Sequence, residues 1–317
     1  MTATSPVTLA VTGDVNFAGA SAAALAPGGL DAVAPVLAAA DLTVVNLETA
    51  VTDRGTPVAK QFTFRAPAAA FPALQAAGVD VVGLANNHGV DYGLVGLRDT
   101  LAAAGIAQFP LVGAGEDVEE AFAPYTADVG GHRVAVLDAT QVLDASLAAD
   151  WTATATHPGL AVVQDRAGVD RLLAAVRAVR PSVESVVVLL HWGQEKNSCP
   201  LPRQQTLAAE LVAAGADAVV GSHAHVQLGN GWLHAGGRTG FVDYGLGNFV
   251  FSARSGATTS TGVLRLTLPG AGGVSAASWS PARIEAGIPH LLTGAQARQA
   301  TAAKDALREC TGLSATP

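Results

Sequence analysis

The stretch SVVVLLHWGQEKNSCPLPRQQTLAAELVAAGADAVVGSHAHV, residues 185–226, decides the fold. It opens with an apolar run at 185–193, continues through an alanine- and leucine-rich segment at 202–215 that ends in glycine, and returns to an apolar run at 216–222. This order predicts a strand, a helix closed by glycine and a second strand. Because both runs are continuously apolar, we expect their sheet to be covered on both faces.

The same alternation of strand and helix extends toward the N-terminus. We predict strands at 7–13, 42–48 and 79–86, and helices at 31–40, 68–78 and 93–105. A hairpin at 125–139, a long surface loop at 140–164, a helix at 165–180 and β-hairpins over 226–285 complete the prediction. Since no linker divides the chain, we predict an α/β protein with one catalytic domain over 1–292 and a polar tail or helix over 293–317.

Composition excludes several classes of function. Hydrophobic residues make up 50% of the 317 residues and charged residues 14%, which is typical of a compact protein. A net charge of −8 without basic runs disfavours nucleic acid and anionic membranes as partners. No apolar run approaches the roughly 20 residues of a membrane span, and the first residues lack the pattern of a signal peptide. We therefore predict a cytoplasmic protein without a membrane partner.

The two cysteines are too few for a disulfide framework. Cys310 lies in the polar tail, so we do not expect it to pair with Cys199. A cofactor-free racemase with two thiols would need such a pair, and this chemistry is therefore disfavoured.

Polar side chains follow five of the predicted buried strands. The carboxyl ends of these strands carry, in chain order, Asp14, Glu48, Asn87 with His88, His191, and His223 with His225. In α/β sheets this edge is where ligands bind. A lone histidine at a strand end is usually structural, but five such coincidences predict a functional site.

The residue types indicate a divalent metal ion and no organic cofactor. Carboxylates, an amide and imidazoles form a mixed oxygen and nitrogen set that suits Mn, Fe, Zn, Mg or Ca. A carboxylate between two such sets bridges two ions at roughly 3.5–4 Å in hydrolytic sites. If the segment 223–225 is extended, His223 and His225 point the same way and reach one cluster.

Six motifs resemble a known family. They are GDVNFAG (13–19), VVNLETAVTDRG (44–55), FTFRAP (62–67), LANNHGVDYG (84–93), the stretch from LLHWGQE to SHAHV (189–226) and YGLGNFVF (244–251). Over roughly residues 8–252 the chain resembles the CapA group of poly-γ-glutamate-type proteins, which belongs to the calcineurin-like metallophosphoesterase superfamily. The resemblance implies a four-layer α/β/β/α sandwich with two central mixed sheets and a metal centre at one edge.

The resemblance also implies roles for the residues at that edge. Asp14 would be the first metal ligand, Glu48 would bridge two ions, and His88 would be the general acid–base. The remaining ligands would be Asn87, His191, His223 and His225. His225 is alternatively a catalytic residue that is free for proton transfer. The superfamily usually opens with Asp-x-His, whereas this chain has Asn16 in the histidine's place. Asn16 would then be a ligand through its neutral amide oxygen, so we expect one of two sites to bind more weakly. One tightly held ion, such as Ca or Mg, is the alternative to two.

Other polar residues have two interpretations each. Asp91 caps the helix near Gly93 or orients His88, a role for which Asp53 competes. Lys60 and Arg65 hold a substrate carboxylate or phosphate, or they are solvated charges. Trp192 lines the substrate pocket or packs in the core.

The chemistry of the site leaves three functions open. Some stand-alone CapA-like proteins of actinobacteria epimerise the C-terminal residue of lasso-peptide precursors, and the chain resembles these. Epimerisation of a peptide substrate at Cα is therefore our first expectation. The alternative is hydrolysis of a small phosphoester by a metal-bound hydroxide, with His88 protonating the leaving group. A third is a polyglutamate-binding or capsule-related protein without turnover.

Overall fold

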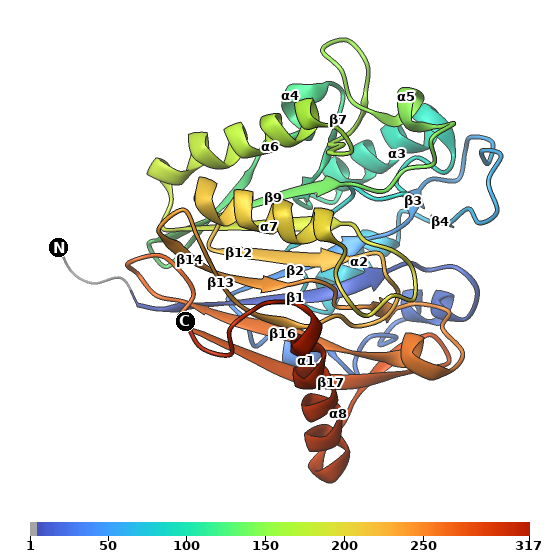
Figure 1. Cartoon of the computed structure of the whole chain (residues 1–317). Coiled ribbons are helices and arrows are strands. Elements are labelled where there is room, and N and C mark those ends of the chain that lie inside the picture. Colours follow the sequence, from blue (N-terminus) through green and yellow to red (C-terminus); the bar gives the residue numbers. More distant parts are fainter. Residues whose placement is uncertain (1–4) are drawn as a thin grey trace.

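Two mixed sheets face each other at the centre of the protein, and helices cover the outer faces (Figure 1). The computed structural model describes residues 5–317, so the first four residues of the predicted catalytic domain lie outside the described residues. The first sheet has the order β18-β17-β16-β1-β2-β5-β6, with β15 beside β1. Its strands are β1 (Val7–Val15), β2 (Leu42–Leu47), β5 (Val81–Gly83), β6 (Leu111–Val112), β15 (Asn248–Val250), β16 (Ser260–Leu268), β17 (Ala276–Glu285) and β18 (Ile288–Leu291).

The second sheet has six strands in the order β13-β14-β12-β11-β9-β8. They are β8 (Tyr125–Val129), β9 (His132–Thr140), β11 (Ser185–His191), β12 (Ala218–Ser222), β13 (Asn230–Ala235) and β14 (Arg238–Asp243). β11 is parallel to β9 and β12, whereas β8 and β9 form the predicted antiparallel hairpin. In the first sheet β1 is parallel to β2 and β2 to β5, so the carboxyl ends of these strands share one edge.

Alternation along β11 shows how the layers are held together. Val186 and Val188 belong to the apolar cluster under the outer helices, whereas Val187 and Leu189 belong to the cluster between the two sheets. Successive side chains of a strand point to opposite faces, so a strand buried on both faces must be apolar at every position. Three apolar layers thus separate four structural layers, as the resemblance implies. Each Val or Leu buried in them contributes about 1.5–3 kcal/mol to the free energy of unfolding.

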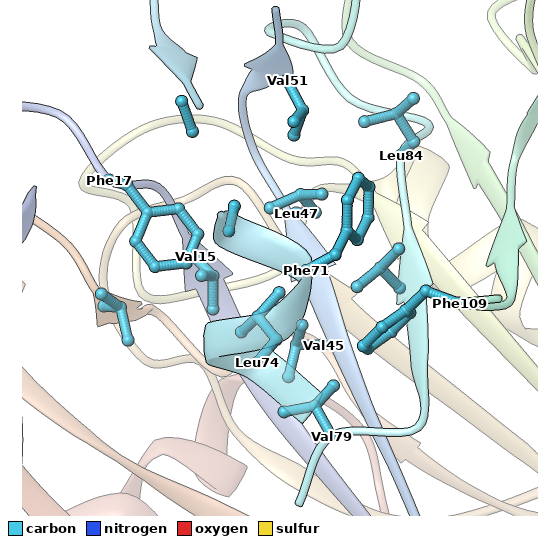
Figure 2. Packing of buried hydrophobic residues seen from close by; sticks show 14 of the residues in the cluster. Val15, Phe17, Val45, Leu47, Val51, Phe71, Leu74, Val79, Leu84 and Phe109 are labelled. Atoms are coloured by element: carbon cyan, nitrogen blue, oxygen red, sulfur yellow. The ribbon is translucent and has the colours of Figure 1, made fainter. Parts of the chain in front are cut away.

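Helices α6 (Arg166–Val179) and α7 (Pro202–Ala214) cover the second sheet, and α2 (Ala70–Ala76) and α3 (Gly93–Ile106) cover the first. Phe71 and Leu74 of α2 pack against Val45 and Leu47 of β2 (Figure 2). The shorter elements are η1 (Gly19–Leu25), α1 (Ala34–Leu37), β3 (Ala50–Val51), β4 (Arg65–Ala66), β7 (Ala114–Gly115), α4 (Val118–Ala121), α5 (Ala148–Trp151), β10 (Gly159–Leu160), η2 (Arg180–Ser182), η3 (Gly256–Thr259), α8 (Gly294–Ala306) and η4 (Leu307–Cys310).

Two sequence predictions of secondary structure need correction. The helix predicted over 31–40 is one turn, α1, because Pro35 is tolerated only in the first turn of a helix. The segment 140–164 is not a loose surface loop. It buries Trp151 and Leu160, and β10 pairs with β7, so it packs against the first sheet's helical layer.

Cys199 and Cys310 form a disulfide, and the expectation that they do not pair is therefore wrong. The C-terminal helix packs on β17 of the first sheet, and the turn after it contacts β13 of the second. This path brings the two Cα atoms to 5.7 Å, a contact that no local pattern encodes. The bond joins residues 111 positions apart. By restricting the unfolded chain, a loop of this length raises the free energy of unfolding by about 4–5 kcal/mol. Disulfides persist in oxidising compartments, so this bond counts against the cytoplasmic prediction, which stays a prediction. Across residues 5–317, no helix has both the length and the hydropathy that crossing a membrane requires.

Candidate metal centre

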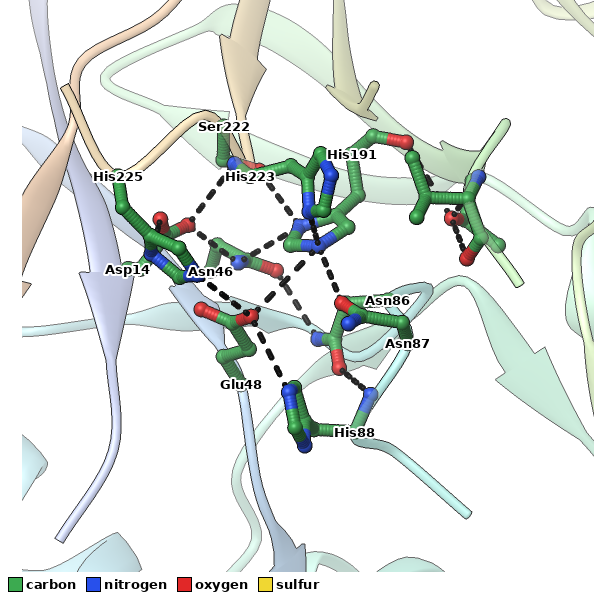
Figure 3. A network of polar contacts seen from close by, with 12 residues as sticks. Asp14, Asn46, Glu48, Asn86, Asn87, His88, His191, Ser222, His223 and His225 are labelled. Atoms are coloured by element: carbon green, nitrogen blue, oxygen red, sulfur yellow. Dashed lines mark hydrogen bonds and ion pairs between the residues drawn. The ribbon is translucent and has the colours of Figure 1, made fainter. Parts of the chain in front are cut away.

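Most of the predicted metal ligands, together with His88, meet where the carboxyl ends of β1, β2, β5, β11 and β12 converge (Figure 3). The first sheet brings the carboxylates, the amides and His88, and the second sheet brings the other three imidazoles. Glu48 lies between them, with the second sheet's histidines on one side and His88 on the other.

Asp14 owes its position to an irregularity in β1. The register between β1 and β2 shifts between Thr12 and Asp14, and the backbone N–H of Asp14 donates to the carbonyl of Gly247 at 2.9 Å. A Cβ on Gly13 would lie 1.7 Å from the same carbonyl oxygen. Only glycine permits this close approach, which places the Asp14 carboxylate at the edge of the sheet.

A first group of ligand atoms comes from Asp14, Glu48 and His225, which we call the carboxylate cluster; these atoms all lie within 4.8 Å of one another. Nδ1 of His225 lies 3.3 Å from Oδ2 of Asp14, and its Nε2 lies 4.0 Å from Oε1 of Glu48. Both carboxylates are fully buried. This cluster therefore combines two carboxylates with one imidazole.

A second group comes from Glu48, His191 and His223, which we call the imidazole cluster. Nε2 of His191 lies 3.7 Å from Oε1 of Glu48 and 3.1 Å from Nδ1 of His223. The amide Oδ1 of Asn87 lies 2.7 Å from the same Nε2, which brings this predicted ligand to the cluster. Glu48 is thus common to both clusters.

The buried carboxylate oxygens fit a cation. Within residues 5–317, Oδ2 of Asp14 and both oxygens of Glu48 are buried without a hydrogen-bond donor. Buried polar atoms are rarely left unsatisfied, because each costs about 1–3 kcal/mol. Carboxylate oxygens and imidazole nitrogens are ligands of Mn, Zn or Mg, so the donor set and its unsatisfied atoms both suit divalent ions.

The two clusters differ in how their histidines ionise. Burial lowers the pKa of His223 to about 3, with a further contribution from His225, and burial also lowers the pKa of His191 well below 6.5. Burial opposes the charge on His225 too, but the carboxylates of Glu48 and Asp14 outweigh it and raise the pKa of His225 to about 10. Burial, together with Asp14, raises the pKa of Glu48 well above 4.5. The imidazole cluster is therefore neutral at its histidines, as metal ligands must be, whereas His225 carries a proton.

The two histidines of the stretch VVGSHAHV reach the site by an unexpected backbone route. His223 has φ of 90° and His225 has φ of 56°, so neither is extended and the reasoning from strand alternation is wrong. Left-handed backbone at a residue other than glycine costs about 1–3 kcal/mol and persists only where neighbouring contacts enforce it. Here Asn248 supplies such contacts, because its Oδ1 lies 2.8 Å from Nδ1 of His225 and its Nδ2 donates to the His225 carbonyl at 3.3 Å.

His88 lies next to Glu48 and is held from behind by Asp91. Nδ1 of His88 donates to Oδ2 of Asp91 at 2.6 Å, and Nε2 lies 3.8 Å from Oε1 of Glu48. Lys60 pairs with the other Asp91 oxygen at 2.7 Å and donates to the Asn87 carbonyl. Asp91 thus contacts His88, as the second interpretation expects, and α3 has no side-chain cap. Burial lowers the pKa of His88 below 6.5 despite Asp91.

Several predicted residues do not reach the ligand clusters. Oδ1 of Asn16 accepts hydrogen bonds from the N–H of Ala18 at 3.2 Å and the hydroxyl of Ser21 at 3.0 Å. These contacts hold the oxygen toward Ala18 and Ser21, and a role for Asn16 as a metal ligand stays a prediction. Asp53 is exposed and lines a groove beside α3, so Asp91 and not Asp53 pairs with His88.

The three predicted substrate-binding residues lie in different surroundings, and a substrate role for Lys60 and Arg65 stays a prediction. Lys60 directs its ammonium inward to Asp91 and Asn87 rather than toward solvent. Arg65 is exposed and stacks over the ring of Tyr92 at 5.0 Å. Trp192 is fully buried in the core under α7, and its Nε1 donates to the Tyr244 carbonyl at 3.0 Å. Its neighbour His191 points to the site, and alternation along the chain turns Trp192 away.

Four polar residues at the site escaped the sequence prediction: Asn46, Asn86, Ser222 and Asn248. Nδ2 of Asn46 donates to Oδ1 of Asp14 at 2.9 Å and lies 3.2 Å from Nδ1 of His191. Ser222 Oγ lies 3.0 Å from that same nitrogen. Such contacts orient metal ligands. Asn46 precedes Glu48 by two residues on a strand, which is the signal that could have identified it.

Two phenylalanines form an apolar wall beside the clusters. The ring of Phe64 stacks on His88 with centroids 4.1 Å apart, and Phe251 lies 4.9 Å from the ring of His225. Phe64 and Phe251 contact each other edge to face at 5.8 Å. They lie in the FTFRAP and YGLGNFVF motifs, and the sequence pattern assigned them no role.

Solved structures with this architecture define the class. The 5′-nucleotidase precursor of Thermus thermophilus aligns with a TM-score of 0.55 and 17% identity, covering 94% of this chain and 58% of that one. A phosphatase from Mycoplasma pneumoniae aligns with a TM-score of 0.52 and 11% identity, covering 93% and 97%. Identities this low establish the fold alone. The fold is that of the calcineurin-like metallophosphoesterases, as predicted.

Sequence relatives then define the family. The model of the bacterial capsule synthesis protein PGA_cap matches residues 8–253. The capsule biosynthesis protein CapA of Bacillus anthracis is 34% identical over 70% of this chain and 52% of its own length. The PGA biosynthesis protein CapA of Bacillus subtilis strain 168 is 30% identical over 69% and 55%. The chain therefore belongs to the PGA_cap family, which confirms the resemblance, and it spans about half the length of these curated relatives.

Proposed function

We propose that this chain is a divalent-metal-dependent phosphoester hydrolase that serves the synthesis of a capsule or polyglutamate. The observation that carries the proposal is Glu48, whose two buried and unsatisfied oxygens lie between the carboxylate cluster and the imidazole cluster. Solved structures of similar fold are named as a nucleotidase precursor and a phosphatase. Curated relatives are named for capsule and PGA biosynthesis.

The ligand clusters would hold one or two divalent ions. Such ions, when bound, polarise a phosphoryl oxygen and lower the pKa of a bound water. The protein's own contribution is to keep Asp14, Glu48, His191, His223 and His225 in place, with Asn46 and Ser222 orienting His191. Which of Ca, Mn, Mg and Zn supports activity is to be measured by loading the protein with each metal.

His88 is the residue that we assign to proton transfer. Asp91 accepts a hydrogen bond from Nδ1 of His88, which leaves Nε2 as the ring nitrogen that transfers a proton. Nε2 faces Glu48 and the two ligand clusters. Lys60 fixes the second oxygen of Asp91, and Phe64 covers the face of the imidazole. This arrangement restricts the ring to one orientation, from which Nε2 of the protonated ring would donate its proton to a leaving-group oxygen.

The test is hydrolysis of bis(p-nitrophenyl) phosphate by protein loaded with Mn²⁺, Zn²⁺, Mg²⁺ or Ca²⁺ in turn. We expect His88→Asn to lower kcat by about 10²–10⁴-fold, the usual worth of a general acid, without changing the bound metal. The exposed His290 on β18 provides the matched control, His290→Asn, which should leave kcat unchanged. Failure of the parent to hydrolyse the ester with every metal would overturn the proposal.

Peptide epimerisation stays a second candidate with one supporting feature. The Nε2 atoms of His88 and His225 lie 3.8 and 4.0 Å from Oε1 of Glu48, so two imidazoles flank one position. Two bases are what removal and return of a Cα proton require. Incubation with a candidate peptide in deuterated water would introduce one deuterium at Cα, and peptides that stay unlabelled with every metal would exclude this candidate.

A further inference from the structure

The C-terminal segment 293–317 lies beyond the part of the chain that the family model matches. It nevertheless contacts the two loops that lead to His225 and Asn248. Lys304 of α8 is 1% exposed, which is rare for a lysine. Its Nζ donates to the carbonyl of Leu228 at 2.8 Å and to the carbonyl of Gly245 at 3.2 Å. It also pairs with the buried carboxylate of Asp243 at 2.8 Å and lies 5.0 Å from the centre of the Trp279 ring.

The two carbonyls belong to the two loops that position His225. Leu228 follows His225 by three residues, and Gly245 precedes Asn248 by three. The loops are joined by a hydrogen bond from the N–H of Leu228 to the Gly245 carbonyl at 2.9 Å. Lys304 therefore binds both loops at the base of the pair, close to Leu228 and Gly245. The contact between His225 and Asn248 lies at the other end of the same two loops.

The rest of the segment is fastened nearby. The disulfide joins Cys310 to Cys199, in the loop between His191 and α7. Nε2 of Gln205 on α7 donates to the Thr311 carbonyl at 3.1 Å, and Nε of Arg308 donates to the Asn230 carbonyl at 2.6 Å. The segment is thus held against the second sheet at several points around Lys304.

We propose that Lys304 is a positioning residue for the carboxylate cluster, and that segment 293–317 is a clamp that holds His225 in its left-handed conformation. The strained backbone at His223 and His225 requires contacts that enforce it. His223 follows β12 directly and its N–H donates to Oδ1 of Asp14 at 3.3 Å, so it has an anchor of its own. His225 depends on the base that Lys304 binds. The inference rests on the metal site proposed above.

The test compares Lys304→Met combined with Asp243→Asn, which leaves no buried charge unpaired, with the parent protein. We expect binding of the ion at the carboxylate cluster to weaken by about 10–100-fold, as for other residues that orient ligands, with the ion at the imidazole cluster unchanged. Calorimetric titration with Co²⁺ measures both affinities. Hydrogen exchange of residues 223–229 should rise in the same variant. The control is Arg298→Met, a charge removed from the exposed side of α8.

A folded double variant with parental Co²⁺ affinities and parental exchange would overturn the clamp. If the double variant does not fold, Cys199→Ser with Cys310→Ser decides the question. This variant leaves Lys304 in place. We expect a smaller loss of Co²⁺ affinity at the carboxylate cluster, whereas unchanged affinity and unchanged hydrogen exchange would overturn the clamp. Hydrogen exchange keeps the two proposals apart. A parent that binds no Co²⁺ contradicts the metal site, while faster exchange at 223–229 in the variant still supports the clamp.

Discussion

The carboxylate cluster and the imidazole cluster share Glu48, yet their remaining ligands are held in different ways. His191 ends a regular strand and His223 follows one directly, and the pKa values of both are lowered, so both are neutral. His225 instead lies in a strained loop that Asn248 supports, and its pKa is raised to about 10. The comparison indicates that the imidazole cluster is preformed for an ion, whereas the carboxylate cluster must first lose a proton and depends on contacts far along the chain.

The largest effect is expected where the two clusters coincide. Glu48→Gln removes the ligand that both share, so we expect both ions to be lost and activity with them. Elemental analysis of the purified variant measures this. Burial, together with Asp14, raises the pKa of Glu48, so ionising this side chain costs the folded state free energy. The neutral glutamine should therefore leave the Tm of the metal-free protein equal or higher. Loss of only one ion would show that Glu48 serves a single cluster.

Single histidine variants separate the clusters. His223→Asn should weaken the ion at the imidazole cluster by at least about 100-fold and leave the other, and His225→Asn should do the reverse. Two-site calorimetric titration with Co²⁺ checks both. If either variant weakens both ions equally, the clusters act as one site and the comparison fails.

The two clusters should also differ in the number of protons that they release when an ion binds. With a pKa of about 10, His225 is protonated at pH 7 and must lose that proton to bind an ion, whereas His223, with a pKa of about 3, has none to lose. Affinity at the carboxylate cluster should therefore rise with pH up to about 10, and affinity at the imidazole cluster should change little near neutrality. Calorimetry at pH 7 in buffers of different ionisation enthalpy measures the protons released. Equal release at both clusters would contradict the assignment.

The smallest effect is expected for a carboxylate outside both clusters. Glu184 pairs with Arg133 at the surface, and hydrogen bonds from Arg133 lower its pKa from 4.5 to about 2. A lowered pKa means stability that is present above pH 4.5 and lost as the pH falls toward 2. Glu184→Gln should cost about 0.2–1 kcal/mol at pH 7 and nothing near pH 2, with metal binding unchanged. Urea denaturation at the two pH values checks this, and an equal cost at both would show that the pair's charge contributes nothing.

Much of the fold follows from local pattern. Continuous apolar runs predicted β1, β2, β5, β11 and β12, because only strands buried on both faces need that pattern. The position of a polar residue directly after each run predicted Asp14, Glu48, His88 and His191 at one edge. Helix length was less predictable, as Pro35 within α1 shows. The parallel order of these strands then brings their ends together whatever the details of packing.

Local sequence patterns therefore specify the strands, their shared edge and the chemical types gathered there. The partner of each side chain depends on how the elements pack in three dimensions. Asp91 rather than Asp53 contacts His88, and Trp192 points into the core. The side chain of Asn16 accepts a hydrogen bond from the nearby Ala18 N–H, and Cys310 forms a disulfide with Cys199. The physical reason is that periodicity reports burial along one segment, whereas a contact such as that of Lys304 with Leu228 and Gly245 exists only after both sheets and the C-terminal helix have packed.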